Sequence, residues 1–173
     1  MKWIDFNMSL DFYTNIRNIS CCFTGHRKIE NQLIPYINNA LLNQIECLII
    51  KGFRYFYCGG AVGFDTLAEK AVIKLRKKYP DVKLIIAVPH RGQSNYFKAS
   101  EKQEYHELLS QADIVIYLSS HYYNGCMHMR NRFMVDRSSY CICYLTKNIG
   151  GTAYTIKYAE KQGLDIVLLP DTF

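Results

Sequence analysis

Short apolar runs alternate with longer amphipathic stretches from about residue 17 to the end of the chain. The apolar runs are brief, and most are continuously apolar, which is typical of strands buried on both faces of a sheet. They predict strands over residues 19–23, 55–58, 83–88, 113–118, 140–145 and 165–169.

Between these strands, apolar residues recur at three- and four-residue steps, as they do on one face of a helix. Ile37, Leu41 and Ile45 follow this spacing after the first strand, and Leu67 and Ala71 follow it after the second. The predicted helices cover residues 34–49, 64–75, 95–110, 126–137 and 152–162.

Strands and helices therefore alternate along the chain, which favours a parallel sheet with right-handed crossovers and helices on both faces. Gly163 follows the last predicted helix and is the residue type that ends helices in the left-handed conformation. We expect a single Rossmann-like, doubly wound α/β domain with a mainly parallel sheet over residues 17–173, preceded by an N-terminal extension over residues 1–16.

The composition fits one soluble domain. The 173 residues are 49% hydrophobic and 21% charged, which excludes a disordered chain. No uninterrupted apolar run approaches the roughly 18 residues of a membrane-spanning helix. The N-terminus carries Asp5 and Asp11 and lacks the apolar core of a secretory signal. These features predict a cytoplasmic protein without a membrane partner.

The seven cysteines predict neither a disulfide framework nor a metal site. Their number is odd, and the chain has no C-x-x-C pair. Cys141 and Cys143 have no matching Cys or His pair at zinc spacing. We expect reduced, mostly buried thiols.

The charge indicates phosphate-bearing partners only weakly. Lys and Arg number 21 against 15 Asp and Glu, a net charge of +6, which suits nucleotides and nucleic acids alike. Much of the excess is a lysine row on the helix over 64–75 and just beyond it, which we interpret as a solvated outer face. The lysines are Lys70, Lys74, Lys77 and Lys78.

Glycine, histidine and arginine gather in the loops that directly follow the predicted strands. These loops are residues 24–27, 59–65, 89–93, 119–125 and 146–152. The carboxyl ends of parallel strands share one edge of a sheet, where ligands bind near the switch point in strand order. This one-sided enrichment predicts a ligand site at that edge.

Two of these loops are glycine-rich turns between a strand and a helix. Gly59 and Gly60 precede the helix that carries Asp65, and Gly150 and Gly151 precede the helix predicted to begin at Thr152. Such turns bring backbone N–H groups and a helix N-terminus to a phosphate. Neither is a G-x-G-x-x-G fingerprint or a Walker A loop. The alternative for each turn is tight geometry alone, with the acid in the first helical turn and the threonine as a helix cap.

Two His-Arg pairs follow strands on the same edge. His26 and Arg27 come after Gly25, and His90 and Arg91 come after the third strand. The guanidinium fork suits phosphate or carboxylate. A solvated loop explains each pair equally well, but their shared position favours ligand contacts.

The helix over 126–137 adds further candidates. Asn131 is placed to contact a ligand, and Asp136 either does the same or pairs with Arg132 four residues before it. Aromatic residues in or beside the loops either stack on a base, pack within the protein or form dimer contacts. The aromatic residues are Tyr96, Phe97, Tyr122 and Tyr123.

Common catalytic motifs are absent from the sequence. It contains no G-x-S-x-G elbow and no H-E-x-x-H motif, and the rim carboxylates show no spacing that demands acid-base chemistry. We therefore assign no catalytic residue and no metal ligand.

The segments 22–27, 59–65, 131–136 and 150–152 together resemble the YpsA-like branch of the SLOG superfamily. That superfamily includes DprA-like DNA-processing proteins, the "lonely guy" phosphoribohydrolases and nucleotide-sensing domains of bacterial defence systems. The resemblance covers nearly the whole chain from residue 17. It implies a Rossmann-like homodimer that binds a nucleotide or nucleotide-derived ligand at the glycine-rich edge.

One departure from the superfamily concerns hydrolysis. The phosphoribohydrolases carry a Pro-Gly-Gly-x-Gly-Thr-x-x-Glu motif with a catalytic Glu, and the matching position here holds Thr155. The resemblance therefore implies phosphate binding without the family's catalytic carboxylate.

Three hypotheses for function follow. The first is a sensor or sequestering protein for a nucleotide-type ligand, with ADP-ribose or NAD-related molecules favoured. The second is a hydrolase of an N-glycosidic or phosphate bond that uses Asp65 or Glu69. The third is DprA-like nucleic-acid binding, which ranks last because the lysine row has the pattern of an outer helix face.

Overall fold

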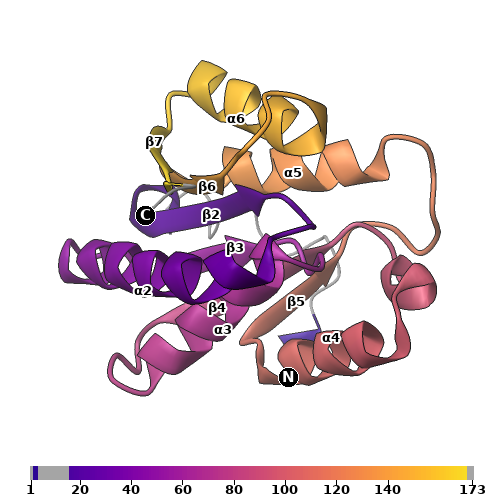
Figure 1. The fold of residues 1–173 in the computed structure, drawn as a ribbon, viewed down its shortest axis with the longest axis horizontal. Helices are drawn as coiled ribbons and strands as arrows, with labels where there is room; N and C mark the ends of the chain where they lie inside the picture. The colour runs from indigo at the N-terminus through magenta and orange to yellow at the C-terminus, as the bar shows by residue number, and fades with distance from the viewer. Residues whose placement is uncertain (1, 4–15, 171–173) are drawn as a thin grey trace.

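The computed structural model describes residues 2–3 and 16–170, which form a three-layer α/β domain (Figure 1). Seven parallel strands make one sheet in the order β1-β5-β4-β3-β2-β6-β7. The strands are β1 (Lys2–Trp3), β2 (Ser20–Gly25), β3 (Tyr55–Cys58), β4 (Lys83–Val88), β5 (Ile114–Tyr117), β6 (Tyr140–Tyr144) and β7 (Asp165–Leu168). The predicted fold class is confirmed.

Helices cover both faces of the sheet. They are α2 (Ile34–Ile50), α3 (Phe64–Arg76), α4 (Ala99–Gln111), α5 (Cys126–Asp136) and α6 (Gly150–Lys161). Figure 1 shows α5 and α6 on one side of the sheet and α2, α3 and α4 on the other. Each face has its own apolar core, because neighbouring residues of a strand point to opposite sides: Cys21 faces the α2–α3–α4 layer and Cys22 the α5–α6 layer.

The order of the strands creates a switch point at β2. From β2 the chain adds β3, β4 and β5 outward in one direction, then crosses to place β6 on the other side of β2. The loop after β2 leads to α2 on one face of the sheet, whereas the loop after β6 leads to α6 on the other face (Figure 1). The two loops therefore diverge, which leaves a crevice at the carboxyl ends of these neighbouring strands.

One helical stretch, residues 31–50, is long and apolar enough to cross a membrane by length and composition alone. Its apolar face packs in the domain core, where Ile37, Leu41, Ile45 and Leu48 are buried. The helix accordingly has the contacts of a core helix.

Most predicted strands and helices agree with the structure to within one or two residues at each end, and structurally informative differences occur at three places. The helix expected over 95–110 is two elements, the 3-10 helix η3 (Gln93–Tyr96) and α4, because Phe97 is extended and Glu101 accepts a hydrogen bond from the Lys98 N–H (2.9 Å) that starts α4. Helix α6 begins at Gly150, two residues before the expected start. Within the predicted extension 1–16, β1 pairs with β5, and residues 4–15 lie outside the described residues.

The left-handed glycine after the last helix and the burial of most cysteines agree with expectation. Gly163, two residues beyond the end of α6, has φ +73°. All seven cysteines are free, and all except Cys47 are buried. Within the described part of the chain, no group of three His, Cys, Asp or Glu side chains is placed to hold a metal ion.

Candidate functional site

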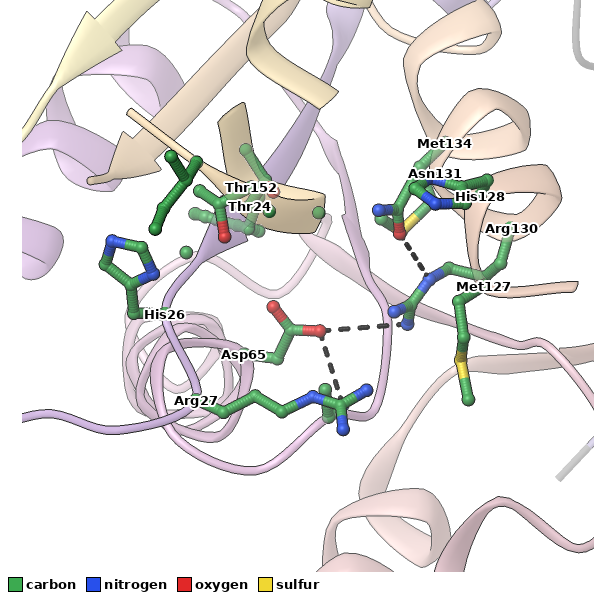
Figure 2. Close-up of a pocket in the computed structure, with 16 residues that line it drawn as sticks. Thr24, His26, Arg27, Asp65, Met127, His128, Arg130, Asn131, Met134 and Thr152 are labelled. Atoms are coloured by element: carbon green, nitrogen blue, oxygen red, sulfur yellow. Dashed lines mark hydrogen bonds and ion pairs between the residues drawn. The ribbon is translucent and has the colours of Figure 1, made fainter. Parts of the chain in front are cut away.

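A cavity of about 350 Å³ opens at the carboxyl ends of β2 and β6, beside the first turns of α3, α5 and α6 (Figure 2). It lies in the crevice that the strand order predicts. Eight of the twelve predicted site residues line it: Gly25, His26, Arg27, Asp65, Asn131, Gly150, Gly151 and Thr152.

His26 joins the two loops that frame the crevice. Its Nε2 atom accepts hydrogen bonds from the backbone N–H groups of Thr146 (3.0 Å) and Lys147 (3.4 Å). An imidazole nitrogen that accepts must carry a lone pair, so this geometry requires the neutral ring with its proton on Nδ1. His26 therefore holds the loop after β6 against the loop after β2.

The Gly59 turn is occupied by carboxylates of its own chain. Asp65 Oδ2 accepts hydrogen bonds from the Gly59 N–H (3.2 Å) and the Ala61 N–H (3.3 Å), and Glu69 Oε1 accepts one from the Gly60 N–H (3.1 Å). These are the amides expected to cradle a phosphate. Gly59 and Gly60 consequently do not line the cavity, and the phosphate site predicted at this turn already has its negative partners.

Gln93 completes the same turn from η3. Its Nε2 donates to the carbonyl oxygens of Gly59 (3.1 Å) and Gly60 (2.6 Å). The N–H groups and the carbonyl oxygens of the turn are thus both bonded to buried side chains, which fixes the turn beside the cavity.

Arg130 of α5 closes this cluster. Its side chain is buried, with Nη1 3.8 Å from Asp65 Oδ2 and also donating to the Gly59 carbonyl. A Cβ at Gly59 would collide with the guanidinium, so the glycine is needed for close approach. The sequence interpretation did not include Arg130, because nothing in a helical stretch rich in polar residues marks one arginine as buried.

Burial controls the ionisation of the two acids. It raises the pKa of the Asp65 carboxyl, while the Arg130 charge and the two amides oppose that rise. Burial also raises the pKa of Glu69, and the neighbouring Asp65 charge adds to the effect. Burial therefore weakens the tendency of both carboxyl groups to ionise, and one of them, Asp65, lines the cavity.

Unlike the Gly59 turn, the N-terminus of α6 has no side-chain cap. The helix begins at Gly150, which has φ +81°, and no side chain makes a capping hydrogen bond. The predicted Thr152 cap is therefore wrong, since the helix starts before that residue. A Cβ added at Gly151 would meet no atom within 4 Å. First-turn amides have no intrahelical acceptor, so this open turn can receive an anion.

Asn131 links the two glycine turns. Its Oδ1 accepts from Arg130 Nε (2.7 Å), and its Nδ2 donates to Thr155 Oγ1 (2.7 Å). Thr155 Oγ1 in turn donates to the Gly151 carbonyl (2.7 Å). A continuous set of hydrogen bonds thus runs from the Gly59 turn through α5 to the first turn of α6.

The expected pair between Asp136 and Arg132 is not among the ion pairs of the described residues. Asp136 Oδ1 accepts from the Tyr158 hydroxyl (2.8 Å), and Arg132 Nη1 donates to the Tyr154 hydroxyl (3.3 Å). Both side chains bond across to α6 because α5 and α6 pack side by side, which a spacing rule within one helix cannot show.

His90 and Arg91 do not line the cavity. The His90 ring is buried and meets Tyr122 edge-on at 5.5 Å, and the Arg91 guanidinium lies 4.8 Å from the centre of the Tyr117 ring. They lie after β4, farther along the carboxyl edge. Tyr96 is 94% exposed, so this second region presents an open aromatic surface.

The cavity also has apolar walls that the sequence interpretation missed. Met127 and Met134 come from α5, and Ile149 precedes α6. Methionine and isoleucine side chains suit the flat, weakly polar surface of a ring system. The arrangement thus combines an anion site, polar groups and an apolar wall in one space.

Comparisons with known proteins agree with this architecture. The family model YpsA, described as the YspA SLOG family, matches residues 21–167. A prophage-derived protein of Bacillus subtilis, YoqJ, is 31% identical over 149 residues, covering 79% of this chain and 87% of its own.

Solved structures show the same fold at low sequence identity. DNA processing protein A (DprA) from Streptococcus pneumoniae matches with a TM-score of 0.64 at 17% identity, covering 95% of this chain and 54% of that protein. This chain therefore spans about half the length of the pneumococcal protein. DprA from Helicobacter pylori, described for its single-stranded DNA binding mode, matches with a TM-score of 0.65 at 16% identity, covering 95% of this chain and 70% of its own.

Proposed function

Because the chain belongs to the YspA SLOG family, we propose that it binds a nucleotide or nucleotide-derived small molecule in the cavity at the carboxyl ends of β2 and β6. The phosphate lies at the first turn of α6, and the ligand's ring packs against the methionine wall. ADP-ribose and NAD-related molecules are the favoured ligands, and the protein acts as a sensor or a sequestering protein in the cytoplasm.

The observation that carries this proposal is the contrast between the two glycine turns. The Gly59 turn donates its amides to Asp65 and Glu69, whereas the α6 turn faces the cavity without a side-chain cap. The N-terminal end of the helix dipole favours negative charge there. Arg27, which lines the same cavity and is exposed, adds a positive charge.

The same geometry disfavours hydrolysis by the two candidate acids. Asp65 and Glu69 accept backbone hydrogen bonds that shape the turn, so proton transfer would compete with a structural role. Thr155, at the position of the family's catalytic Glu, donates to the Gly151 carbonyl. We therefore propose binding rather than cleavage.

A thermal-shift panel tests the proposal. AMP, ADP-ribose and NAD are compared with adenosine, which has the same base and ribose but no phosphate. A ligand at about 100 times its Kd should raise the free energy of unfolding by about 2.7 kcal/mol. Stabilisation by phosphate-bearing compounds and not by adenosine supports the site. A melting temperature that none of them changes refutes it.

Single-stranded nucleic acid is a second candidate ligand, favoured by the exposed tyrosines after β4 and β5. Tyr96 and Tyr122 are 94% and 63% exposed. Arg91 lies five residues before Tyr96 and directly follows His90, whose ring meets that of Tyr122. Base stacking on aromatic rings is tolerant of sequence. This candidate predicts oligonucleotide binding that falls steeply with salt and is lost in a Tyr96→Ala, Tyr122→Ala variant. Binding that the double substitution leaves intact excludes this surface.

We also propose that the protein is a homodimer, as the family resemblance implies. Sedimentation equilibrium across a hundredfold range of concentration tests this. A single species of 20.2 kDa throughout would exclude the dimer.

A further inference from the structure

A second cavity, of about 380 Å³, lies on the other side of Arg27 from the first. Arg27 lines both spaces, and the turn that follows β3 contributes Ala61 to the first and Val62 and Gly63 to the second. The two cavities are therefore separated only by the loop after β2 and this turn.

The partition between the cavities is thin and well fixed. The Phe64 N–H donates to the His26 carbonyl (3.1 Å), which joins the two loops. A Cβ on Gly63 would collide with the Arg27 backbone, and Gly63 has φ +84°, so both its conformation and its neighbour require glycine. Figure 2 shows the Arg27 side chain running beneath Asp65 along the edge of the first cavity.

The second cavity has a different chemical character from the first. Apolar side chains from α2, α3 and the loops line it: Ile29, Ile34, Val62 and Leu67. At its rim, Lys70 forms an ion pair with Glu104 (2.5 Å), and Glu101 accepts the Lys98 N–H at the start of α4. Glu101 and Glu104 offset the positive charges of Arg27 and Lys70 in this cavity, and apolar walls with polar edges suit an uncharged heterocycle.

The first cavity is too small to hold a long ligand completely. Pockets for small molecules span roughly 300–1,000 Å³, and the first cavity is near the lower end of that range. It fits one nucleotide unit, which leaves the rest of a longer ligand outside. Arg27 lines both cavities and provides a positive charge where such a ligand would pass from one cavity to the other.

We infer that the second cavity is a subsite for the same ligand, which consists of two ring-bearing units joined through a pyrophosphate. One unit lies in the cavity at the carboxyl ends of β2 and β6, the phosphates lie between the α6 N-terminus and Arg27, and the second ring lies among Ile29, Ile34 and Leu67. This inference rests on the proposed function and names the ligand class, a dinucleotide of the NAD type.

Isothermal titration calorimetry with NAD and its two halves, AMP and NMN, tests the inference on the wild-type chain. NAD should bind at least about tenfold more tightly than either half. Equal affinities for NAD and AMP overturn the second subsite and leave the proposed function standing. If neither compound binds, the proposed function itself fails and the subsite fails with it.

Variants in the second cavity locate the extra affinity. Asn38 lines this cavity from α2, and the adjacent Asn39 is exposed and does not. Asn38→Trp should remove the roughly tenfold preference for NAD over AMP without changing the affinity for AMP. Asn39→Trp should preserve the preference, as the matched control.

A smaller substitution guards against misfolding of the tryptophan variant. Ile34→Ala removes apolar wall instead of filling the space, and it should also lower the affinity for NAD while sparing AMP. Melting temperatures of all variants show whether each is folded. A full preference for NAD in both folded variants would overturn the inference.

Discussion

Arg130 on α5 and Asp65 on α3 form an ion pair within the protein, 65 positions apart in the sequence, with Nη1 and Oδ2 separated by 3.8 Å. Both residues are almost fully buried, at 5% and 6% exposure. The pair joins helices on opposite faces of the sheet across the carboxyl end of β3. It therefore fixes the Gly59 turn from both layers at once.

Removing one partner of this pair should destabilise the fold strongly. Arg130→Met leaves the Asp65 carboxyl in a buried place without its cation, and such changes cost about 3 kcal/mol. Arg132→Met, an exposed position on the same helix, should change stability by less than about 0.5 kcal/mol. Urea unfolding monitored by circular dichroism measures both. Equal effects in the two variants would show that the pair contributes nothing.

The buried acids should make stability fall as pH rises. Burial raises the pKa of Glu69 well above its ordinary value of 4.5, so the folded state keeps this proton where the unfolded chain has lost it. The folded state then binds more protons from pH 4.5 up to the raised pKa, and stability decreases by at most about 1.4 kcal/mol per pH unit in that window.

Glu69→Gln isolates this effect because the amide retains an acceptor for the Gly60 N–H and cannot ionise. The variant's stability relative to wild type should increase as pH is raised from 4 to 8 in urea titrations. Comparing the two proteins at each pH cancels the contribution of other groups. A difference that stays constant over this range contradicts the assigned burial effect.

Most of the fold is predictable from sequence because its strands are buried on both faces. The continuous apolar runs at 55–58 and 83–88 have the bounds of β3 and β4. The break between η3 and α4 was missed because the predicted helix runs through Phe97, which is extended, while α4 starts only after the hydrogen bond from the Lys98 N–H to Glu101. Strand β1 has two residues, which is too short for any periodicity.

The cavity lies at the edge of the sheet where the sequence predicts a ligand site, but the structure gives the two glycine turns different partners from those expected. The Gly59 and Gly150 turns have similar sequences, yet one holds internal carboxylates and the other is open. A local signal separates them: Asp65 and Glu69 follow the first turn on one helical face, and threonines follow the second. The third partner, Arg130, arrives through the tertiary fold and could not be anticipated from spacing.

His26 should control the order of the loop after β6. Replacing it with Phe removes the acceptor for the Thr146 and Lys147 N–H groups, each bond contributing about 1 kcal/mol. Hydrogen exchange should then show roughly tenfold less protection at these two amides, while the amides of β3 keep theirs. His26→Gln, which restores an acceptor, should recover part of the protection. Unchanged exchange at Thr146 and Lys147 in the Phe variant would contradict this role.

A carboxylate introduced at the first turn of α6 should weaken ligand binding without lowering the stability of the fold. In Gly151→Asp the side chain enters open space, and its charge interacts favourably with the N-terminal end of the helix dipole, by about 0.5 kcal/mol. The same charge occupies the proposed phosphate site and repels the ligand. We therefore expect a melting temperature equal to or above that of wild type and at least about tenfold weaker binding of AMP.

Gly151→Ala, which adds a Cβ without charge, should be equally stable and bind within about threefold of wild type, since no atom lies within 4 Å of that Cβ. Thermal unfolding and calorimetry on the same samples give both quantities. Undiminished AMP binding by a folded Gly151→Asp protein would place the phosphate away from α6 and contradict the proposed site.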